Sequence, residues 1–314
     1  MDLSVSAASV FPASHMDLLD GTYCAALTTL MPDGQPQTTP IWYNREGDCV
    51  LINSMRAFRK TQNMRSDPRV SLLIFDPRKP LHNVEVRGVV EEMTEEGALD
   101  HLDALTALYM GKPDAHFFGD SIPAHFQATH VPVKMRIRPL RVRAEQGTLN
   151  LETPKLANWP APACAAAEDL PAALPLPASH LDLFSRPVHG ILATLMPSGQ
   201  PHSSVVWTDY DGGFVLLNTT LERRKGLNMA ANPRVTLLVV DPDNTSRWIE
   251  VRGRVVDMVR GAVAEAHADK LTERYASPKR AFYGDIYPES QRARETRVMV
   301  KIRPIKIAMD AIFK

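Results

Sequence analysis

Short apolar runs alternate with polar turns through most of the chain. The stretch from Val215 to Gly253 shows the pattern in full: an apolar run passes through a polar turn and a basic triplet into a short predicted helix. Asn232-Pro233 ends this helix, because proline cannot continue it, and an apolar strand begins at once. The same succession of elements occurs earlier, from Val50 to Gly88.

These two stretches belong to a repeat that covers most of the chain. Gly34 matches Gly199, 165 positions later, and we expect this offset to hold from end to end. The other matched segments include Leu30–Pro36 with Leu195–Pro201, Trp42 with Trp207, Lys60 with Lys225, and Glu85–Gly88 with Glu250–Gly253. Solenoid repeats are usually about 20–50 residues long, so this period indicates a duplicated domain.

Each copy predicts six short, mostly antiparallel strands and a few helices, which suggests a small closed barrel. Met-Pro-Asp-Gly and Met-Pro-Ser-Gly mark equivalent hairpin turns in the two copies. We place the first domain at residues 1–150 and the second at 177–314. Residues 151–176 are rich in Pro and Ala, a composition typical of a semi-stiff tether, with Trp159 as its one candidate anchor.

Composition narrows the functional classes. The 36 basic residues balance the 36 acidic ones. The net charge of the chain therefore does not favour nucleic acid or a membrane surface as a partner. The start of the chain lacks the features of a signal peptide, and no apolar run is long enough to span a membrane. The three cysteines show no CxxC spacing and the histidines no metal-site spacing. We therefore expect a cytoplasmic protein without a structural metal.

The basic triplet after the polar turn is the most informative local pattern. Phosphate groups are often held where a strand passes through a hydroxyl-rich turn into a helix whose first residues are cations. Cations at a helix N-terminus oppose the helix dipole, which favours a nearby anion. The alternative, a solvated charged face, is the default for a short charge run, but the repetition of the whole arrangement favours phosphate. No dinucleotide-binding or serine-hydrolase motif is present.

Each copy resembles the pyridoxamine 5′-phosphate oxidase-like superfamily of flavin- and deazaflavin-dependent oxidoreductases. The second copy, with LMPSGQPHSSVVW, NTTLERRKGLNMAANPRV and DPDNTSRWIEVRG, is most similar to the F420-dependent branch. The resemblance implies a mostly β (α+β) fold: two FMN-binding split β-barrels, six-stranded, antiparallel and of Greek-key type. It also implies that the barrels pack as an intramolecular pseudo-dimer. Whether two such chains also form a homodimer is left open.

The resemblance further implies a cofactor in a groove between the barrels, with its phosphate at the basic turn and its ring over the second strand. The implied contacts of the second copy are Ser203, Val206, Trp207, Asn218, Thr219, Arg223, Arg224 and Lys225. Those of the first copy are Thr38, Ile41, Trp42, Asn53, Ser54, Arg59 and Lys60. Phe58 stands where the second copy has Arg223, so we expect tighter binding at the second turn. No catalytic side chain is assigned, although Tyr43, Tyr109 and Tyr283 are candidate proton donors.

Two functional hypotheses follow. The first is an oxidoreductase that uses F420, or FMN as second choice, to transfer hydride to a small organic acceptor. In that case extra basic residues would meet the acidic tail of F420, and the candidates are Arg56, Arg78, Arg223 and Arg247. The alternative is a non-catalytic protein that binds or carries flavin, F420 or haem. Neither hypothesis requires a nucleic acid or a membrane, and the identity of the small-molecule substrate stays open.

Overall fold

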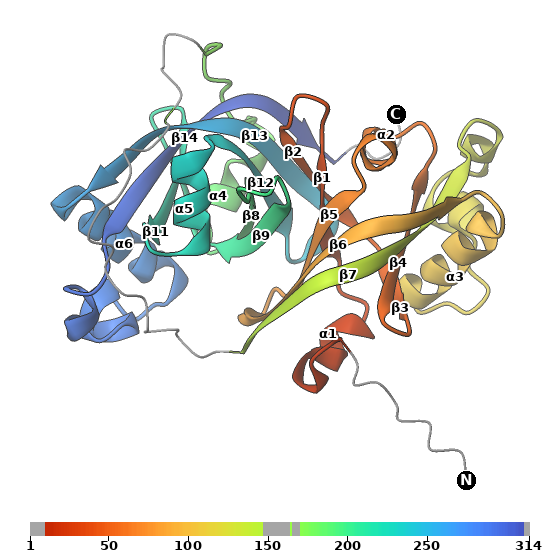
Figure 1. Ribbon diagram of the computed structural model, residues 1–314, viewed down its shortest axis with the longest axis horizontal. Helices are drawn as coiled ribbons and strands as arrows, with labels where there is room; N and C mark the ends of the chain where they lie inside the picture. Colours follow the sequence, from red (N-terminus) through yellow and green to blue (C-terminus); the bar gives the residue numbers. More distant parts are fainter. Residues whose placement is uncertain (1–9, 147–163, 165–169, 311–314) are drawn as a thin grey trace. The chain divides into compact units, whose positions relative to one another are not determined.

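Two curled antiparallel sheets, one for each copy of the repeat, account for most of the computed structural model (Figure 1). The structure describes residues 10–146, 164 and 170–310. Most of the predicted linker, with Trp159, lies outside these residues. In the described part of the chain no helix is long and apolar enough to cross a membrane. The expected fold class, a duplicated and mostly β split barrel, is confirmed.

The first sheet has seven strands in the order β2-β1-β5-β6-β7-β4-β3. Their bounds are β1 Ala25–Leu30, β2 Pro36–Ile41, β3 Tyr43–Glu46, β4 Cys49–Met55, β5 Arg69–Asp76, β6 Lys79–Thr94 and β7 Pro132–Gln146. The α-helices are α1 Met16–Leu19, α2 Arg59–Ser66 and α3 Ala98–Met110, with short helical turns at Ala13–His15, Phe117–Ser121 and Ala124–Ala128.

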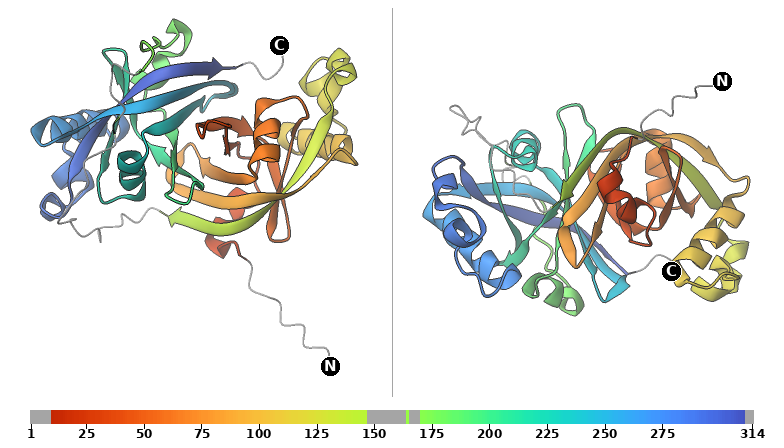
Figure 2. Two further views of the ribbon diagram at one scale, coloured as in Figure 1. Left: turned by 45° about the horizontal axis from the view of Figure 1, so that its top comes forward. Right: turned by 90° about the horizontal axis from the view of Figure 1, so that it is seen from below.

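The second sheet, drawn in green to blue in Figure 2, repeats this plan. Its strand order is β10-β11-β14-β13-β12-β8-β9. Its strands are β8 Gly190–Leu195, β9 Pro201–Val206, β10 Thr208–Asp211, β11 Phe214–Thr220, β12 Arg234–Asp241, β13 Asn244–Arg260 and β14 Arg297–Met309. Its α-helices are α4 Asp182–Ser185, α5 Arg224–Ala231 and α6 Ala262–Tyr275, with short helical turns at Ala178–His180, Phe282–Ile286 and Glu289–Gln291.

Each sheet has seven strands and not the six that the sequence predicts, because the predicted second strand is broken at a tryptophan. Trp42 separates β2 from β3, and Trp207 separates β9 from β10. The two halves of the broken strand lie at opposite edges of their sheet. Since a single residue joins these edges, each sheet must curl until they meet, which closes it into a barrel. The two tryptophans therefore mark the closing corners.

Alternate residues of the strands fill the interior of each barrel. In the second barrel the interior includes Val215, Leu217, Val235, Leu237 and Val239, none more than 1% exposed. This alternation is the period-two pattern of a strand with one face in a core. The first barrel has an equivalent cluster, built around the alternate residues of β5. Burial of these side chains supplies most of the stability of each barrel.

The 165-residue offset does not hold through the long helix of each copy. The amide of Asn53 donates to the carbonyl of Ala98, and the amide of Asn218 donates to that of Ala264, both at 2.7 Å. The two acceptors are 166 positions apart, and the offset returns to 165 at the matching Gly119 and Gly284. Relative to the first copy, the second copy therefore has one additional residue before its long helix and one residue fewer after it.

The contacts between residues divide the chain into two compact units. The first unit consists of Met1–Thr29 and Pro40–Gln146, and the second consists of Leu30–Thr39 and Gly147–Lys314. Within the second unit the side-chain amide of Gln35 donates to the carbonyl of Val235 at 2.8 Å. The backbone N–H of Thr38 donates to the fully buried carboxylate of Glu250, also at 2.8 Å. The second unit thus takes in the hairpin between β1 and β2. The pairing of the two barrels stays a prediction.

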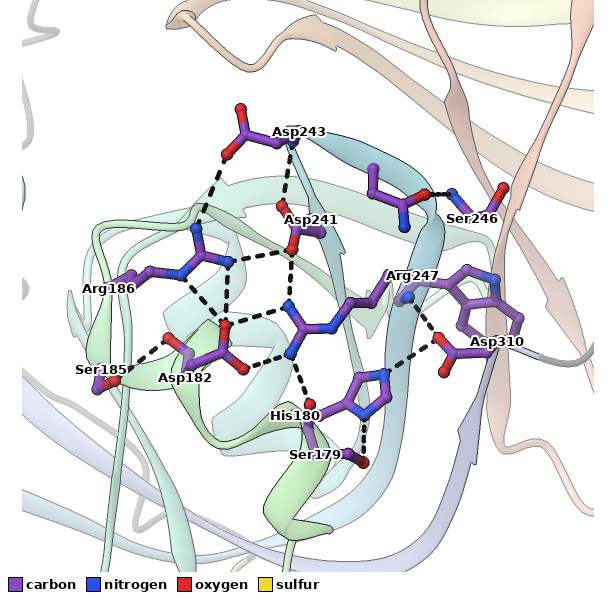
Figure 3. A network of polar contacts seen from close by, with 12 residues as sticks. Ser179, His180, Asp182, Ser185, Arg186, Asp241, Asp243, Ser246, Arg247 and Asp310 are labelled. Atoms are coloured by element: carbon purple, nitrogen blue, oxygen red, sulfur yellow. Dashed lines mark hydrogen bonds and ion pairs between the residues drawn. The ribbon is translucent and has the colours of Figure 1, made fainter.

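A network of charged side chains fastens the segment before β8 to the second barrel (Figure 3). Arg247 of β13 donates to Asp241 at 2.7 Å and to the carbonyl of Ser179 at 2.5 Å, and it also binds Asp182 of α4. Arg186 bridges the same two carboxylates, each at 3.1 Å. The Arg247 guanidinium lowers the pKa of Asp182. Burial opposes the same change at Asp241, but hydrogen bonds outweigh it and lower its pKa too.

Gly253 offers a test of how closely β13 and β14 approach. The register of these strands shifts at Gly253, and a Cβ there would lie 2.6 Å from the carbonyl oxygen of Arg303. We expect Gly253→Ala to lower the free energy of unfolding by about 1–3 kcal/mol, because backbone must move to make room. Thermal and urea unfolding would measure the change. Lys306→Ala, at an exposed position of β14, is the matched control and should have little effect.

The network around Arg247 predicts a defined pH dependence. At pH 7 we expect Arg247→Ala to lower the free energy of unfolding by roughly 1–3 kcal/mol, since hydrogen bonds to charged groups are lost. The folded-state pKa values of Asp182 and Asp241 are lowered, so their contribution is present above the ordinary Asp value of about 3.9. It is lost as the pH falls through the folded values. The difference from wild type should therefore shrink below about pH 4, and a constant difference would contradict the assignment.

Candidate functional site

The basic turn of the second copy leads from β11 into α5 without a side-chain cap. Arg223, in an extended conformation, is the residue before the helix, and no side chain bonds to the first N–H groups. A Cβ at Gly226 would lie 2.3 Å from the carbonyl oxygen of Thr220. Glycine therefore lets the first helical turn press against the end of β11. The uncapped N–H groups and the positive end of the helix dipole favour an anion here.

The three cationic side chains of this turn differ in their hydrogen-bond partners. Arg224 is exposed, and it has neither a hydrogen bond nor an ion pair within the described ranges. The ammonium of Lys225 donates to the carbonyl of Val205 at 3.2 Å, at the end of β9. The guanidinium of Arg223 donates to the hydroxyl of Tyr287 at 2.5 Å and lies 5.6 Å from the centre of that ring. Lys225 thus connects the basic turn to the strand predicted to lie under a cofactor ring.

The polar residues of the turn are less accessible than the sequence suggests. The Asn218 side chain is engaged at both ends, because it donates to Ala264 and accepts from Arg297 at 3.0 Å. It therefore holds α6 against β11. Thr219 is 2% exposed, on the same strand face as the interior residue Leu217, and its hydroxyl has no hydrogen-bond partner among the residues described.

The predicted contacts on β9 do not share one face. Val206 is buried in the hydrophobic interior of the barrel, so only its backbone remains for a ligand. Ser203 is also buried, on the opposite face of the strand by alternation. Trp207 is half-buried at the closing corner, where its indole N–H donates to the ring nitrogen of His189 at 3.1 Å. Burial lowers the pKa of His189 to about 4, which keeps this acceptor neutral at physiological pH.

Trp207 is one of four rings that form a continuous aromatic platform, which consists of Trp207, Tyr275, Phe282 and Tyr287. Trp207 stacks on Tyr275 with ring centres 5.2 Å apart, and its edge meets Phe282. Phe282 in turn stacks on Tyr287 at 5.0 Å. The platform ends at Arg223, which bonds to Tyr287. Trp207 and Arg223 are predicted from the sequence, whereas the aromatic residues that connect them carry no sequence signal that marks them as part of the site.

A buried ion pair supports the platform from one side. The guanidinium of Arg297 lies 3.9 Å from the centre of the Phe282 ring and pairs with Glu295, and both charged side chains are at most 5% exposed. Arg297 also donates to the hydroxyl of Tyr283 at 3.0 Å, which donates in turn to Glu295 at 2.7 Å. Burial raises the pKa of Tyr283 to about 12.

The three tyrosines considered as proton donors all have engaged hydroxyl groups. Tyr283 is bound in the ion-pair network just described. The Tyr43 hydroxyl donates to the carbonyl of Leu18, and the Tyr109 hydroxyl contacts the carbonyls of Tyr23 and Tyr43 at 3.0 and 3.1 Å. Burial raises the pKa of Tyr43 and of Tyr109. None of the three therefore presents a free hydroxyl in this state.

The basic turn of the first copy keeps part of this arrangement. Arg59 is exposed, and no described residue bonds to it. Lys60 is half-buried, and Ser54 is a buried hydroxyl without a hydrogen-bond partner in the described part of the chain. Asn53 holds α3 as Asn218 holds α6. Trp42 stacks on Tyr109 at 5.1 Å.

The remaining predicted residues of the first copy are buried. Ile41 belongs to the hydrophobic interior, so its side chain is enclosed in the core. Thr38 is fully buried in the hairpin that belongs to the second unit. These positions show that a strand that looks accessible in the sequence can be enclosed by tertiary packing.

A second charged cluster was not identified from the sequence. Asp209 lies within hydrogen-bond distance of Lys270 and Arg274, at 2.5 and 2.9 Å. Burial would raise the pKa of Asp209, but hydrogen bonds from His267, Lys270 and Arg274 lower it. Asp209, Lys270 and Arg274 lie along an open groove of about 470 Å³. The carboxylate bonds to both Lys270 and Arg274 of α6, so the cluster links β10 to this helix.

The arginines considered for an acidic tail differ in their partners. Arg247 is bound by two carboxylates in the network of Figure 3, and Arg56 pairs with Glu95 at 3.2 Å. Arg223 and Arg78 have no carboxylate partner in the part of the chain that the structure describes. Of the two, Arg223 adjoins the basic turn.

Comparison with solved structures returns proteins that cover less than half of this chain and most of their own length. An F420 reductase is 35% identical over 42% of this chain and 98% of its own, with a TM-score of 0.37. An FAD-binding protein from Mesorhizobium loti is 23% identical over 42% and 92%, with a TM-score of 0.31. The haem storage protein of Vibrio cholerae is 13% identical over 43% and 95%, with a TM-score of 0.33.

The search of curated proteins found no match. A family model described as pyridoxamine 5′-phosphate oxidase matches the chain twice, over residues 11–133 and 176–309. The two matches include both basic turns, both tryptophan corners and both long helices. Since they span well over half of the sequence, the chain belongs to the pyridoxamine 5′-phosphate oxidase family and contains its domain in tandem.

Proposed function

We propose that this chain is an oxidoreductase that binds a flavin-type cofactor, F420 as first choice and FMN as second, and transfers hydride to a small organic acceptor. The phosphate of the cofactor binds at the basic turn of the second copy, formed by Arg223, Arg224 and Lys225. Membership of the family supports a flavin-type group. The motifs of the second copy, which resemble those of the F420-dependent branch, support F420 over FMN.

The observation that carries this proposal is the net positive charge at the start of α5, which Glu222 offsets only in part. Within the described ranges the Arg224 guanidinium has no partner, and the Arg223 guanidinium bonds only to the neutral hydroxyl of Tyr287. The helix dipole adds positive potential at the same end. Cations in this position raise the free energy of the folded state unless an anion binds, so the turn fits a phosphate group.

The donor set also fits such a cofactor. Arg224 can turn toward a ligand without breaking an existing bond, and guanidinium groups bind phosphate through two parallel hydrogen bonds. The half-buried ring of Trp207 offers flat apolar surface near Lys225, whereas Phe282 and Tyr287 are themselves buried. The arrangement combines an anion site with a surface suited to a planar ring.

When bound, F420 or FMN supplies the hydride chemistry, and the protein has to position the ring and exclude water. The chain needs no side-chain nucleophile for this. Arg224 and Lys225 hold the anionic end, while Trp207 is fixed by its bond to His189 and cannot rotate freely. The same fixed geometry serves binding without turnover equally well.

A carrier function is the second candidate, and one observation favours it. The hydroxyl groups of Tyr43, Tyr109 and Tyr283 are all engaged in hydrogen bonds. An enzyme that protonates its acceptor would then have to take the proton from water or from the cofactor. A carrier of flavin, F420 or haem has no such requirement.

The phosphate assignment is tested by the double substitution Arg224→Ala and Lys225→Ala. We expect the dissociation constant for F420 to rise at least tenfold, because two charged donors to the phosphate are lost. Fluorescence titration with F420, and separately with FMN, measures the change, and circular dichroism checks the fold. Arg260→Ala, which removes an exposed arginine elsewhere in the same copy, is the control. Wild-type affinity in the double variant would refute the assignment.

Turnover separates the enzyme from the carrier. We expect the wild-type protein to consume reduced F420 in the presence of a quinone or an enone acceptor, followed by the change in F420 absorbance. The Arg224→Ala, Lys225→Ala variant should lose this activity mainly through a higher KM for the cofactor, since it affects binding and not chemistry. Tight binding without turnover against any acceptor would favour the carrier instead.

A further inference from the structure

We infer that each chain binds one equivalent of its cofactor, at the basic turn of the second copy, and that the turn of the first copy no longer serves as a cofactor site. This inference rests on the proposed function and concerns how its sites are distributed. Its basis is a set of coordinated differences around two otherwise matching turns.

The first difference lies at the residue before each helix. Arg223 of the second copy places a guanidinium beside the helix start, where Tyr287 holds it. Phe58 of the first copy occupies the equivalent position, and its ring meets His130 edge-on at 5.9 Å. An anion at the first turn therefore meets an aromatic ring where the second turn offers a charged donor.

The second difference lies in the loop that holds this arginine. In the second copy, Arg297 and Glu295 form a buried pair that also binds Tyr283 and Asn218. The pair fixes the segment that carries Tyr287, which is 6% exposed. A charged donor that is already held in place loses less conformational entropy when it binds a ligand. The second turn is therefore preorganised.

None of these supports is present in the first copy. The residues equivalent to Tyr287, Glu295 and Arg297 are Ile122, His130 and Pro132, which can form neither the ion pair nor the hydroxyl bond. One consequence is that the carbonyl oxygen of the Asn53 side chain is left without a hydrogen-bond partner among the described residues. In the second copy Arg297 satisfies the matching atom of Asn218 at 3.0 Å.

Net charge alone does not distinguish the turns. Glu222 offsets one cation of the second turn, so residues 222–225 and residues 57–60 each carry a formal charge of +2. The Glu222 carboxylate, however, is committed to the backbone N–H of Thr296 at 3.0 Å. The turns therefore differ in how their donors are placed and held, and this placement confines binding to the second copy.

The stoichiometry of binding tests the inference directly. Titration of the full-length protein with F420, followed by fluorescence and by calorimetry, should give one equivalent per chain. We expect Arg223→Phe, which introduces the first-copy residue, to weaken binding at least tenfold. Tyr287→Ile, also a first-copy residue, should weaken it several-fold and serves as a second variant should Arg223→Phe not fold. Arg260→Phe controls for the introduction of an aromatic ring.

Two results would overturn the inference: two equivalents bound with equal affinity, or wild-type affinity in both the Arg223→Phe and Tyr287→Ile variants. Either would leave the proposed function intact, because the cofactor would still bind. Binding of neither F420 nor FMN to the wild-type protein would instead refute the proposed function itself. The two failures are therefore distinguishable in the same titration.

Discussion

The closure of each sheet at a tryptophan is the constraint on which the rest of the structure depends. Trp42 and Trp207 each join two strands that lie at opposite edges of one sheet, so a single residue turns the chain across the seam of a barrel. Each indole stacks on a tyrosine of the long helix. The corner thereby links the barrel to the long helix. In the second copy it is also linked to the basic turn, because Lys225 donates a hydrogen bond to the strand that ends at this corner.

The second organising feature is the net positive charge of the turn at the start of α5, which Glu222 offsets only in part. Several other cations of the second copy bond to carboxylates: Arg247 to Asp182 and Asp241, and Lys270 and Arg274 to Asp209. Folded proteins usually neutralise charges that they partly bury. Arg223 and Arg224, at the start of α5, have no carboxylate partner among the described residues, and the functional proposal rests on these two unpaired charges.

Duplication leaves each copy free to change as long as its barrel still closes. The features needed for closure are present in both copies: the tryptophan corner, the hydrogen bond from Asn53 or Asn218 to the long helix, and the interior residues. Among the residues that differ between the copies are those around the basic turn and in the loop beyond the long helix. Because those residues contribute little to closure, they can change without unfolding the barrel.

The sequence by itself determined the duplication, the β-rich class and the position of both basic turns, because these depend on local periodicity and on matches along the chain. Tertiary structure decided what local patterns cannot express. Val206 lies on a strand of mixed polarity yet its side chain fills the barrel interior, and Asn218, in a polar turn, donates a hydrogen bond to the long helix of its copy. The aromatic platform unites residues far apart in sequence, such as Trp207 and Phe282. Contacts between such distant residues arise only when the sheet closes, so no pattern of neighbouring residues records them.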